Sequence, residues 1–196
     1  MVLSAGDRFG DAEAVVDGPL RLSFADLTER IRSAAGAFGA FGIGKGDRVA
    51  VWAPNSAEWI VAAFGIMTAG AVLVPVNTRF KPEEAADVIA RSGAKAVMVQ
   101  SGFLGADFRT ALDVPTIDLK SDFLTGGSPF PRAPRDWLDG RDVSDVIYTS
   151  GTTGRPKGAM MNHVQTLRMY EEWATLADLR RGDRYMMINP YFHTFG

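Results

Sequence analysis

The stretch from Tyr148 to Gly158, which reads YTSGTTGRPKG, carries the groups that suit a polyphosphate ligand. Its glycines let the backbone turn sharply and approach a ligand closely. Its hydroxyls and free backbone N–H groups supply donors, and Lys157 adds a compact positive charge. Gly158 follows Lys157 where a Walker loop needs Ser or Thr, so this is a different kind of phosphate loop. The candidate ligand-binding residues are Thr149, Ser150, Gly151, Thr152, Thr153, Gly154 and Lys157.

A second candidate, His193, lies in the aromatic run from Asn189 to Gly196. The aromatic side chains around it fit either the wall of a pocket or an ordinary core. A lone histidine is more often a plain buried or surface residue, and the glycine-rich loop has a similar plain alternative as a simple turn. His163, at the start of a predicted helix, carries no signal beyond capping or exposure.

The composition is that of a globular domain, with 46% hydrophobic and 22% charged residues among 196. The 21 Lys and Arg residues against 23 Asp and Glu residues argue against nucleic acid or an anionic membrane as the main partner. The absence of cysteine excludes disulfides, thiolate metal sites and a cysteine nucleophile.

Neither a targeting segment nor a membrane span is predicted. Residues 1–10 have neither a basic start nor an apolar run, so we expect no signal peptide. The longest apolar stretch, residues 59–76, is interrupted by small and polar positions, and we interpret it as a buried helix followed by a strand. Together with the absence of cysteine, which fits a reducing compartment, these features lead us to expect a cytoplasmic protein.

Helix-like and strand-like patterns alternate along the chain, which predicts an α/β fold with a mostly parallel sheet flanked by helices. The expected helices are 24–41, 57–69, 82–92, a weak one at 102–112, and 163–178. The expected strands are a hairpin within 14–22, then 47–52, 71–76, 96–99, 115–117, 143–148, 159–161 and 184–188. Residues 1–13 are expected to be a surface lead-in.

Three parts are expected: an α/β layer over 1–118, an extended proline- and glycine-rich surface connection over 119–140, and a last part over 141–196. Strands on both sides of the glycine-rich loop would place it at the tip of a hairpin, with no helix directly behind it. The Met and aromatic stripe of helix 163–178 is interpreted as core. Asp26 and Arg30 are expected to pair on the outer face of helix 24–41.

The glycine-rich loop resembles the phosphate-binding signature of the adenylate-forming (AMP-binding) enzymes, which include acyl-CoA synthetases, firefly luciferases and peptide-synthetase adenylation domains. YTSGTTGRPKG matches that signature at every position. Other stretches agree in order, so the resemblance spans residues 14–196: LSFADL at 22–27, GDRVA at 46–50, PNS at 54–56, AGAVLVPVN at 69–77 and NPYFHTFG at 189–196.

The resemblance implies an ATP-dependent acyl-CoA ligase. In that family a carboxylate attacks ATP to give an acyl-adenylate and pyrophosphate, and the thiol of CoA then displaces AMP. Lys157 and the loop hydroxyls would hold the phosphates together with Mg²⁺, for which Thr149 is the expected ligand. His193 would lie between the acyl group and the nucleotide, near the path of the thioester step.

The finer assignment favours ligases of fatty acids and other carboxylic acids, of the long-chain-fatty-acid–CoA ligase type, and the last eight residues look most like ligases of lipid or steroid-ring breakdown. An acyl-AMP ligase that loads a carrier protein and a non-catalytic nucleotide-binding module remain alternatives. In the family the large domain continues well beyond the position of Gly196, and a small domain carries a catalytic lysine. Residues 1–196 alone are therefore expected to be an inactive N-terminal part that self-associates through an exposed sheet.

Overall fold

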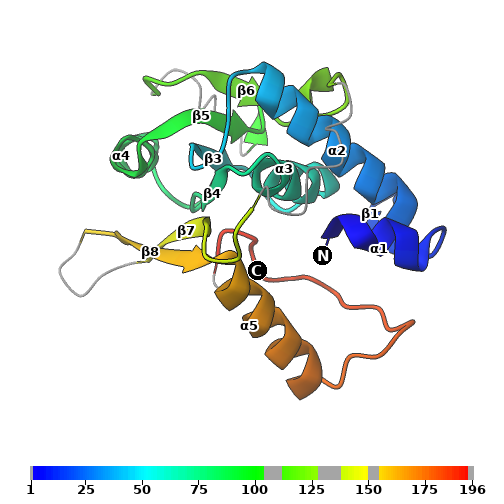
Figure 1. Ribbon diagram of the computed structural model, residues 1–196. Coiled ribbons are helices and arrows are strands. Elements are labelled where there is room, and N and C mark those ends of the chain that lie inside the picture. The colour runs from blue at the N-terminus through cyan, green and yellow to red at the C-terminus, as the bar shows by residue number, and fades with distance from the viewer. Residues whose placement is uncertain (1, 104–111, 128–137, 150–154, 194–196) are drawn as a thin grey trace.

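The computed structural model describes residues 2–103, 112–127, 138–149 and 155–193. Its centre is a six-stranded sheet in the order β6-β5-β3-β4-β7-β8 (Figure 1). The strands from β6 to β7 pair in parallel, and β8 pairs antiparallel with β7. The sheet consists of β3 (Arg48–Trp52), β4 (Val72–Pro75), β5 (Ala94–Val99), β6 (Thr116–Asp118), β7 (Val143–Thr149) and β8 (Lys157–Asn162).

Helices cover both faces of this sheet. α2 (Phe24–Ala40) and α3 (Ala57–Thr68) pack on one face, and α4 (Pro82–Ser92) packs on the other. The strand residues alternate accordingly: Val49 and Val51 join the core with α2 and α3, whereas Ala50 and Trp52 join the core with α4. This buried parallel sheet confirms the predicted α/β class.

The predicted elements around the first core are largely confirmed. The hairpin forms from β1 (Glu13–Asp17) and β2 (Leu20–Ser23), which pair antiparallel. Ser23 begins α2, because its hydroxyl accepts a hydrogen bond from the Asp26 backbone N–H at 3.0 Å. The hydrogen bonds from the Ser23 hydroxyl and backbone to the Asp26 carboxylate lower the pKa of Asp26. The charge of Arg30 acts in the same direction, without the direct ion pair that was predicted.

The lead-in predicted for residues 1–13 lies at the surface, since α1 (Val2–Phe9) has no buried residue, but the sequence analysis did not anticipate that it is helical. Val2 and Leu3 pack against the core beside α2 and α3, and the Phe9 ring lies 4.9 Å from the ring of Phe24. Tertiary contacts therefore stabilise a helix that this glycine-containing segment would not form alone.

The prediction of an extended surface connection over 119–140 was also incomplete. Leu119 and Leu124 are buried, and Asp122–Leu124 form the short helix η3 under α2. Most of the weak helix predicted at 102–112 lies outside the described residues, as do residues 128–137. The division of the chain into three parts therefore stays a prediction.

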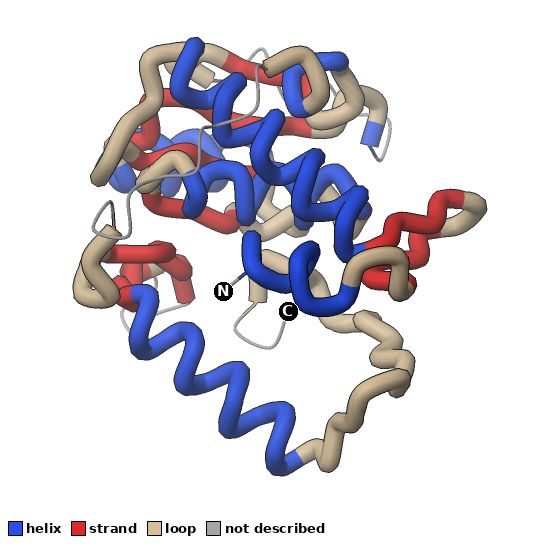
Figure 2. The backbone as a smooth tube through the Cα atoms, turned by 45° about the vertical axis from the view of Figure 1, so that its right-hand side comes forward, coloured by secondary structure: helices blue, strands red, loops and turns tan. Residues whose placement is uncertain are grey.

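The last part of the chain differs most from expectation. Helix α5 (His163–Leu176) stands apart from the other helices, and the segment after it loops back toward the body of the molecule (Figure 2). Its apolar stripe was predicted to be core, yet Trp173 is 45% and Leu176 83% exposed. Residues 184–188, predicted as a strand, form no regular element, and Met186 and Ile188 are exposed.

The described residues contain no helix that is long and apolar enough to cross a membrane. The apolar stretch 59–76 forms most of α3 and then β4, as predicted.

Candidate functional site

The hairpin of β7 and β8 brings two of the predicted site residues together. Thr149 ends β7, Lys157 begins β8, and the two residues are direct partners across the ladder. Opposite residues of an antiparallel pair project from the same face, so the hydroxyl and the ammonium group lie on one side of the hairpin. Both residues are exposed. The predicted ligands Ser150, Gly151, Thr152, Thr153 and Gly154 lie outside the described residues.

The location of the candidate site follows from the β7–β8 hairpin and from the direction of the strands in the sheet. Because β7 runs parallel to β4, and β4 to β3, Thr149 lies at the carboxyl ends of the strands. This edge is where open α/β sheets bind ligands. The structure thus confirms that the glycine-rich stretch interrupts two paired strands and is not followed directly by a helix.

The opposite side of the hairpin faces α4. Val146 and Tyr148 belong to the core on that face of the sheet. Gly158 is the ladder partner of Tyr148, and a Cβ atom at position 158 would come within 3.1 Å of the Tyr148 ring and 2.8 Å of Val146. Glycine is therefore needed at position 158 for close packing against these two side chains.

Charged groups of α4 contact the stem of the hairpin, which the sequence analysis did not anticipate. Asp87 accepts hydrogen bonds from Arg155 at 2.7 Å and from Arg91 at 2.8 Å. Arg91 also donates to the Pro156 carbonyl at 3.0 Å, and its guanidinium lies over the Tyr148 ring. The hydrogen bonds from Arg155 and then Arg91 hold the pKa of Asp87 below its usual range.

The Asp87–Arg91 pair was visible in the sequence as opposite charges one helical turn apart within the predicted helix 82–92. Nothing in the sequence linked that pair to Arg155, which is 68 residues away from Asp87. The fold alone creates this contact.

A buried polar cluster anchors α5 to β7. The Ser144 hydroxyl lies 2.9 Å from the Asp145 carboxylate and 3.0 Å from the Thr166 hydroxyl of α5. It also lies 3.2 Å from the Met161 carbonyl of β8. Burial raises the pKa of Asp145, although the hydrogen bonds from Ser144 and Thr166 act in the opposite direction.

His193 lies at the end of a segment that docks on the loop between β3 and α3. The Asn55 side chain donates to the Asn189 carbonyl at 2.7 Å and accepts from the Tyr191 N–H at 2.8 Å. The Tyr191 ring packs against Trp59 at 5.0 Å. Since Asn55 follows β3, this segment reaches the same sheet edge as Thr149. His193 itself is exposed, and its backbone N–H donates to Pro190.

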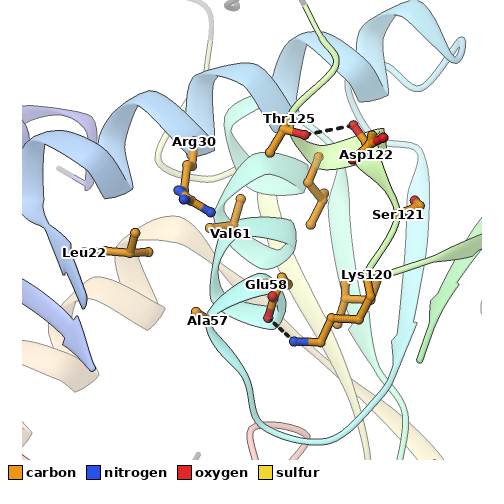
Figure 3. Close-up of a pocket in the computed structure, with 11 residues that line it drawn as sticks. Leu22, Arg30, Ala57, Glu58, Val61, Lys120, Ser121, Asp122 and Thr125 are labelled. Atoms are coloured by element: carbon orange, nitrogen blue, oxygen red, sulfur yellow. Dashed lines mark hydrogen bonds and ion pairs between the residues drawn. The ribbon is translucent and has the colours of Figure 1, made fainter. Parts of the chain in front are cut away.

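A cavity of about 180 Å³ lies elsewhere, between α2, α3 and η3 (Figure 3). Arg30 extends toward it from α2, and Glu58 pairs with Lys120 at 2.6 Å along its border. The predicted site residues that the structure describes, Thr149, Lys157 and His193, do not line this cavity.

The described residues contain no group of three or more His, Cys, Asp or Glu side chains that could hold a metal ion. Magnesium commonly binds through one or two protein oxygens together with phosphates and water. The exposed hydroxyl of Thr149 fits such a partial ligand set, with the remaining ligands supplied by a polyphosphate and solvent.

The sequence matches the AMP-binding enzyme family over residues 3–196, so the chain belongs to that family. It is 40% identical, over 98% of its length, to a methyl-dioxo-octahydroindenyl-propanoyl:CoA ligase of Rhodococcus jostii, of which it covers 42%. It is 33% identical, over 89% of its length, to the long-chain-fatty-acid–CoA ligase FadD13 of Mycobacterium tuberculosis, of which it covers 36%. The chain thus spans less than half the length of these two ligases.

The fold is similar to the crystal structure of the N-terminal domain of FACL13 from Mycobacterium tuberculosis, with a TM-score of 0.86 and 30% sequence identity. That similarity covers 98% of this chain and 51% of the FACL13 chain. The family assignment that the resemblance implied is therefore confirmed, and so is its fold.

Proposed function

We propose that this chain forms the nucleotide-binding part of an ATP-dependent acyl-CoA ligase. The carboxylate of an acid attacks the α-phosphorus of ATP, which releases pyrophosphate and leaves an acyl-adenylate. The thiol of CoA then attacks the acyl carbonyl carbon, and AMP leaves. The observation that carries this proposal is the pairing of Thr149 with Lys157 at the carboxyl edge of the sheet, within a sequence that matches the family.

Charge neutralisation by the hairpin is the main contribution of the described residues. Pyrophosphate carries several negative charges as it leaves, and a fixed ammonium group stabilises that developing charge. Lys157 supplies this group, and the Thr149 hydroxyl, on the same face, orients the phosphates. Thr149 would supply one ligand to magnesium, and the bound ion would add further positive charge beside the phosphates.

His193 is proposed to act in the second half of the reaction. Its segment is fixed through Asn55 and Tyr191 at the same sheet edge as the hairpin. An imidazole there borders the space between the acyl group and the nucleotide, where CoA approaches. We assign it the role of positioning the acyl-adenylate for attack by the thiol.

For the acid, we favour a propanoate attached to a fused ring over a long-chain fatty acid. Two octahydroindenyl-propanoyl:CoA ligases, from Rhodococcus jostii and Mycobacterium tuberculosis, are 40% and 36% identical to this chain. The long-chain-fatty-acid–CoA ligase is 33% identical. All three relatives use CoA according to their names, which supports CoA over a carrier protein as the acceptor.

The test is thioester formation by the enzyme that carries this chain, with ATP, Mg²⁺ and CoA, against ring-bearing propanoates, long-chain fatty acids and short aliphatic acids. The proposal predicts acyl-CoA, AMP and pyrophosphate in equal amounts, with the highest kcat/KM for a ring-bearing propanoate. A preference for long-chain acids would overturn the substrate class only. No acid-dependent AMP from any acid would overturn the ligase proposal.

A further inference from the structure

Helix α4 contacts residues at both ends of the glycine-rich loop. On the outgoing side, Arg155 forms an ion pair with Asp87, and the Pro156 carbonyl accepts a hydrogen bond from Arg91. On the incoming side, the Arg91 guanidinium lies 5.3 Å from the centre of the Tyr148 ring. In Figure 1, α4 lies above the β7–β8 hairpin, on the same side of the molecule.

These contacts act close to the proposed phosphate ligands. The Pro156 carbonyl belongs to the peptide bond that joins Pro156 to Lys157, so the hydrogen bond from Arg91 fixes the backbone of Lys157. Tyr148 precedes Thr149 directly. A single helix thus restrains both residues whose side chains meet across the ladder.

The groups on α4 also restrain one another. Asp87 holds Arg91 in place at 2.8 Å within α4 and pairs with Arg155 of the loop at 2.7 Å. The carboxylate thus contacts the loop directly through Arg155 and also positions Arg91, which donates to the Pro156 carbonyl. All three charged side chains lie at the surface, with 31% to 73% of their area exposed. Exposed ion pairs add little to stability. Their main effect here is therefore on the geometry of the hairpin.

We propose that Asp87, Arg91 and Arg155 are positioning residues that fix the polyphosphate-binding end of the β7–β8 hairpin at the carboxyl edge of the sheet. Together the three residues form a clamp on the hairpin. This inference rests on the proposed function, because it assigns the clamp to the binding of ATP and pyrophosphate. The three residues touch no substrate themselves. Their loss weakens phosphate binding by allowing Lys157 and Thr149 to move apart from their common orientation.

The experiment is acid-dependent exchange of labelled pyrophosphate into ATP by the enzyme that carries this chain. The variants are Asp87→Asn, Arg155→Gln and the double variant, with Arg155→Lys as the conservative change. Asp87→Asn and Arg155→Gln are each expected to raise the KM for pyrophosphate by about fivefold, the size of a lost exposed ion pair. The kcat and the KM for the acid should stay within about twofold of wild type.

Two further outcomes are expected if the residues act as one clamp. The double variant should raise the KM for pyrophosphate no more than Asp87→Asn alone does, because Asp87→Asn already breaks the pair with Arg155. Arg155→Lys, which keeps the charge, should recover most of the loss. Glu172→Gln serves as the matched control, since it breaks the exposed Arg168–Glu172 pair of α5, 2.8 Å long and one turn apart on its helix.

Calorimetric measurement of pyrophosphate binding separates the proposed positioning role from a purely structural role of these residues. Direct titration with pyrophosphate should show weaker binding by Arg155→Gln than by wild type. The Arg155 side chain is 73% exposed, and its replacement leaves the Asp87–Arg91 pair intact. If wild type catalyses the exchange but all variants keep its KM for pyrophosphate, the clamp proposal is overturned while the proposed function stands. The same holds if the KM for the acid rises as much as the KM for pyrophosphate. A wild-type enzyme that neither exchanges nor binds pyrophosphate would overturn both proposals.

Discussion

Replacing Ser144 with alanine tests how firmly the hairpin is anchored to the rest of the fold. The Ser144 side chain is fully buried, and its hydroxyl lies within 3.2 Å of three oxygens: the Asp145 carboxylate, the Met161 carbonyl and the Thr166 hydroxyl. Without it, the nearest hydrogen-bond donor to the same Asp145 oxygen is Thr166, at 3.4 Å. A buried hydrogen bond to a charged group contributes about 2 kcal/mol, so we expect Ser144→Ala to lower the free energy of unfolding by that amount.

The pH dependence of this loss provides a second check. Burial raises the pKa of Asp145 in the folded state, so its stabilising contribution is complete below the pKa of the unfolded chain and is lost as pH rises through the folded pKa. The Ser144 hydroxyl favours the ionised carboxylate and partly offsets that loss. Removing it raises the Asp145 pKa further, so Ser144→Ala should cost most at neutral pH and progressively less in acid.

The assay is urea unfolding followed by tryptophan fluorescence, for wild type, Ser144→Ala, Asp145→Asn and the double variant across the acid range. Asp145→Asn removes the titrating group, so the cost of Ser144→Ala in that background should no longer depend on pH. A loss smaller than about 0.5 kcal/mol at neutral pH, or a loss that grows in acid, would refute the reasoning.

Two other predictions concern packing and association. A Cβ atom at Gly65 of α3 would lie 2.7 Å from the Cβ of Ala34 on α2, so Gly65→Ala should destabilise the fold by about 1 to 2 kcal/mol despite the better helix propensity of alanine. Adding Ala34→Gly should recover part of the loss in a double-mutant cycle, and purely additive effects would show that the helices do not touch there. The exposed side chains Leu176, Met186 and Ile188, each at least 80% exposed, should make the chain self-associate. Light scattering should show larger species that disappear when all three are replaced by serine, whereas a wild-type monomer at high concentration would contradict this prediction.

Much of the fold was predictable because its signals are local or strongly periodic. Apolar runs such as 49–52 are buried on both faces of a parallel sheet, and that pattern can be recognised without knowing the neighbouring elements. Helix α4 begins at Pro82 and ends before Gly93, as its sequence indicates. The glycine-rich motif was also visible in the sequence, because its residues are consecutive, whereas its role in phosphate binding stays a prediction.

The errors have a common physical cause, which is that burial depends on distant partners. Helix α5 carries an apolar stripe, but no described element covers Trp173 or Leu176, and the stripe stays exposed. Conversely, α1 is short and contains Gly6, yet contacts with the core and with Phe24 make it helical. The link from Asp87 to Arg155 arises only when α4 and the hairpin meet, so no pattern within either segment could predict it.

The central claim is that Lys157, at the end of the β7–β8 hairpin, binds the leaving polyphosphate. The most direct test is the rate of acid-dependent pyrophosphate exchange into ATP by the enzyme that carries this chain, compared between wild type and Lys157→Ala. Loss of a charge that neutralises the leaving group should lower kcat/KM for pyrophosphate by at least about a hundredfold, with the folded state intact by circular dichroism. Exchange at the wild-type rate in Lys157→Ala would contradict the account.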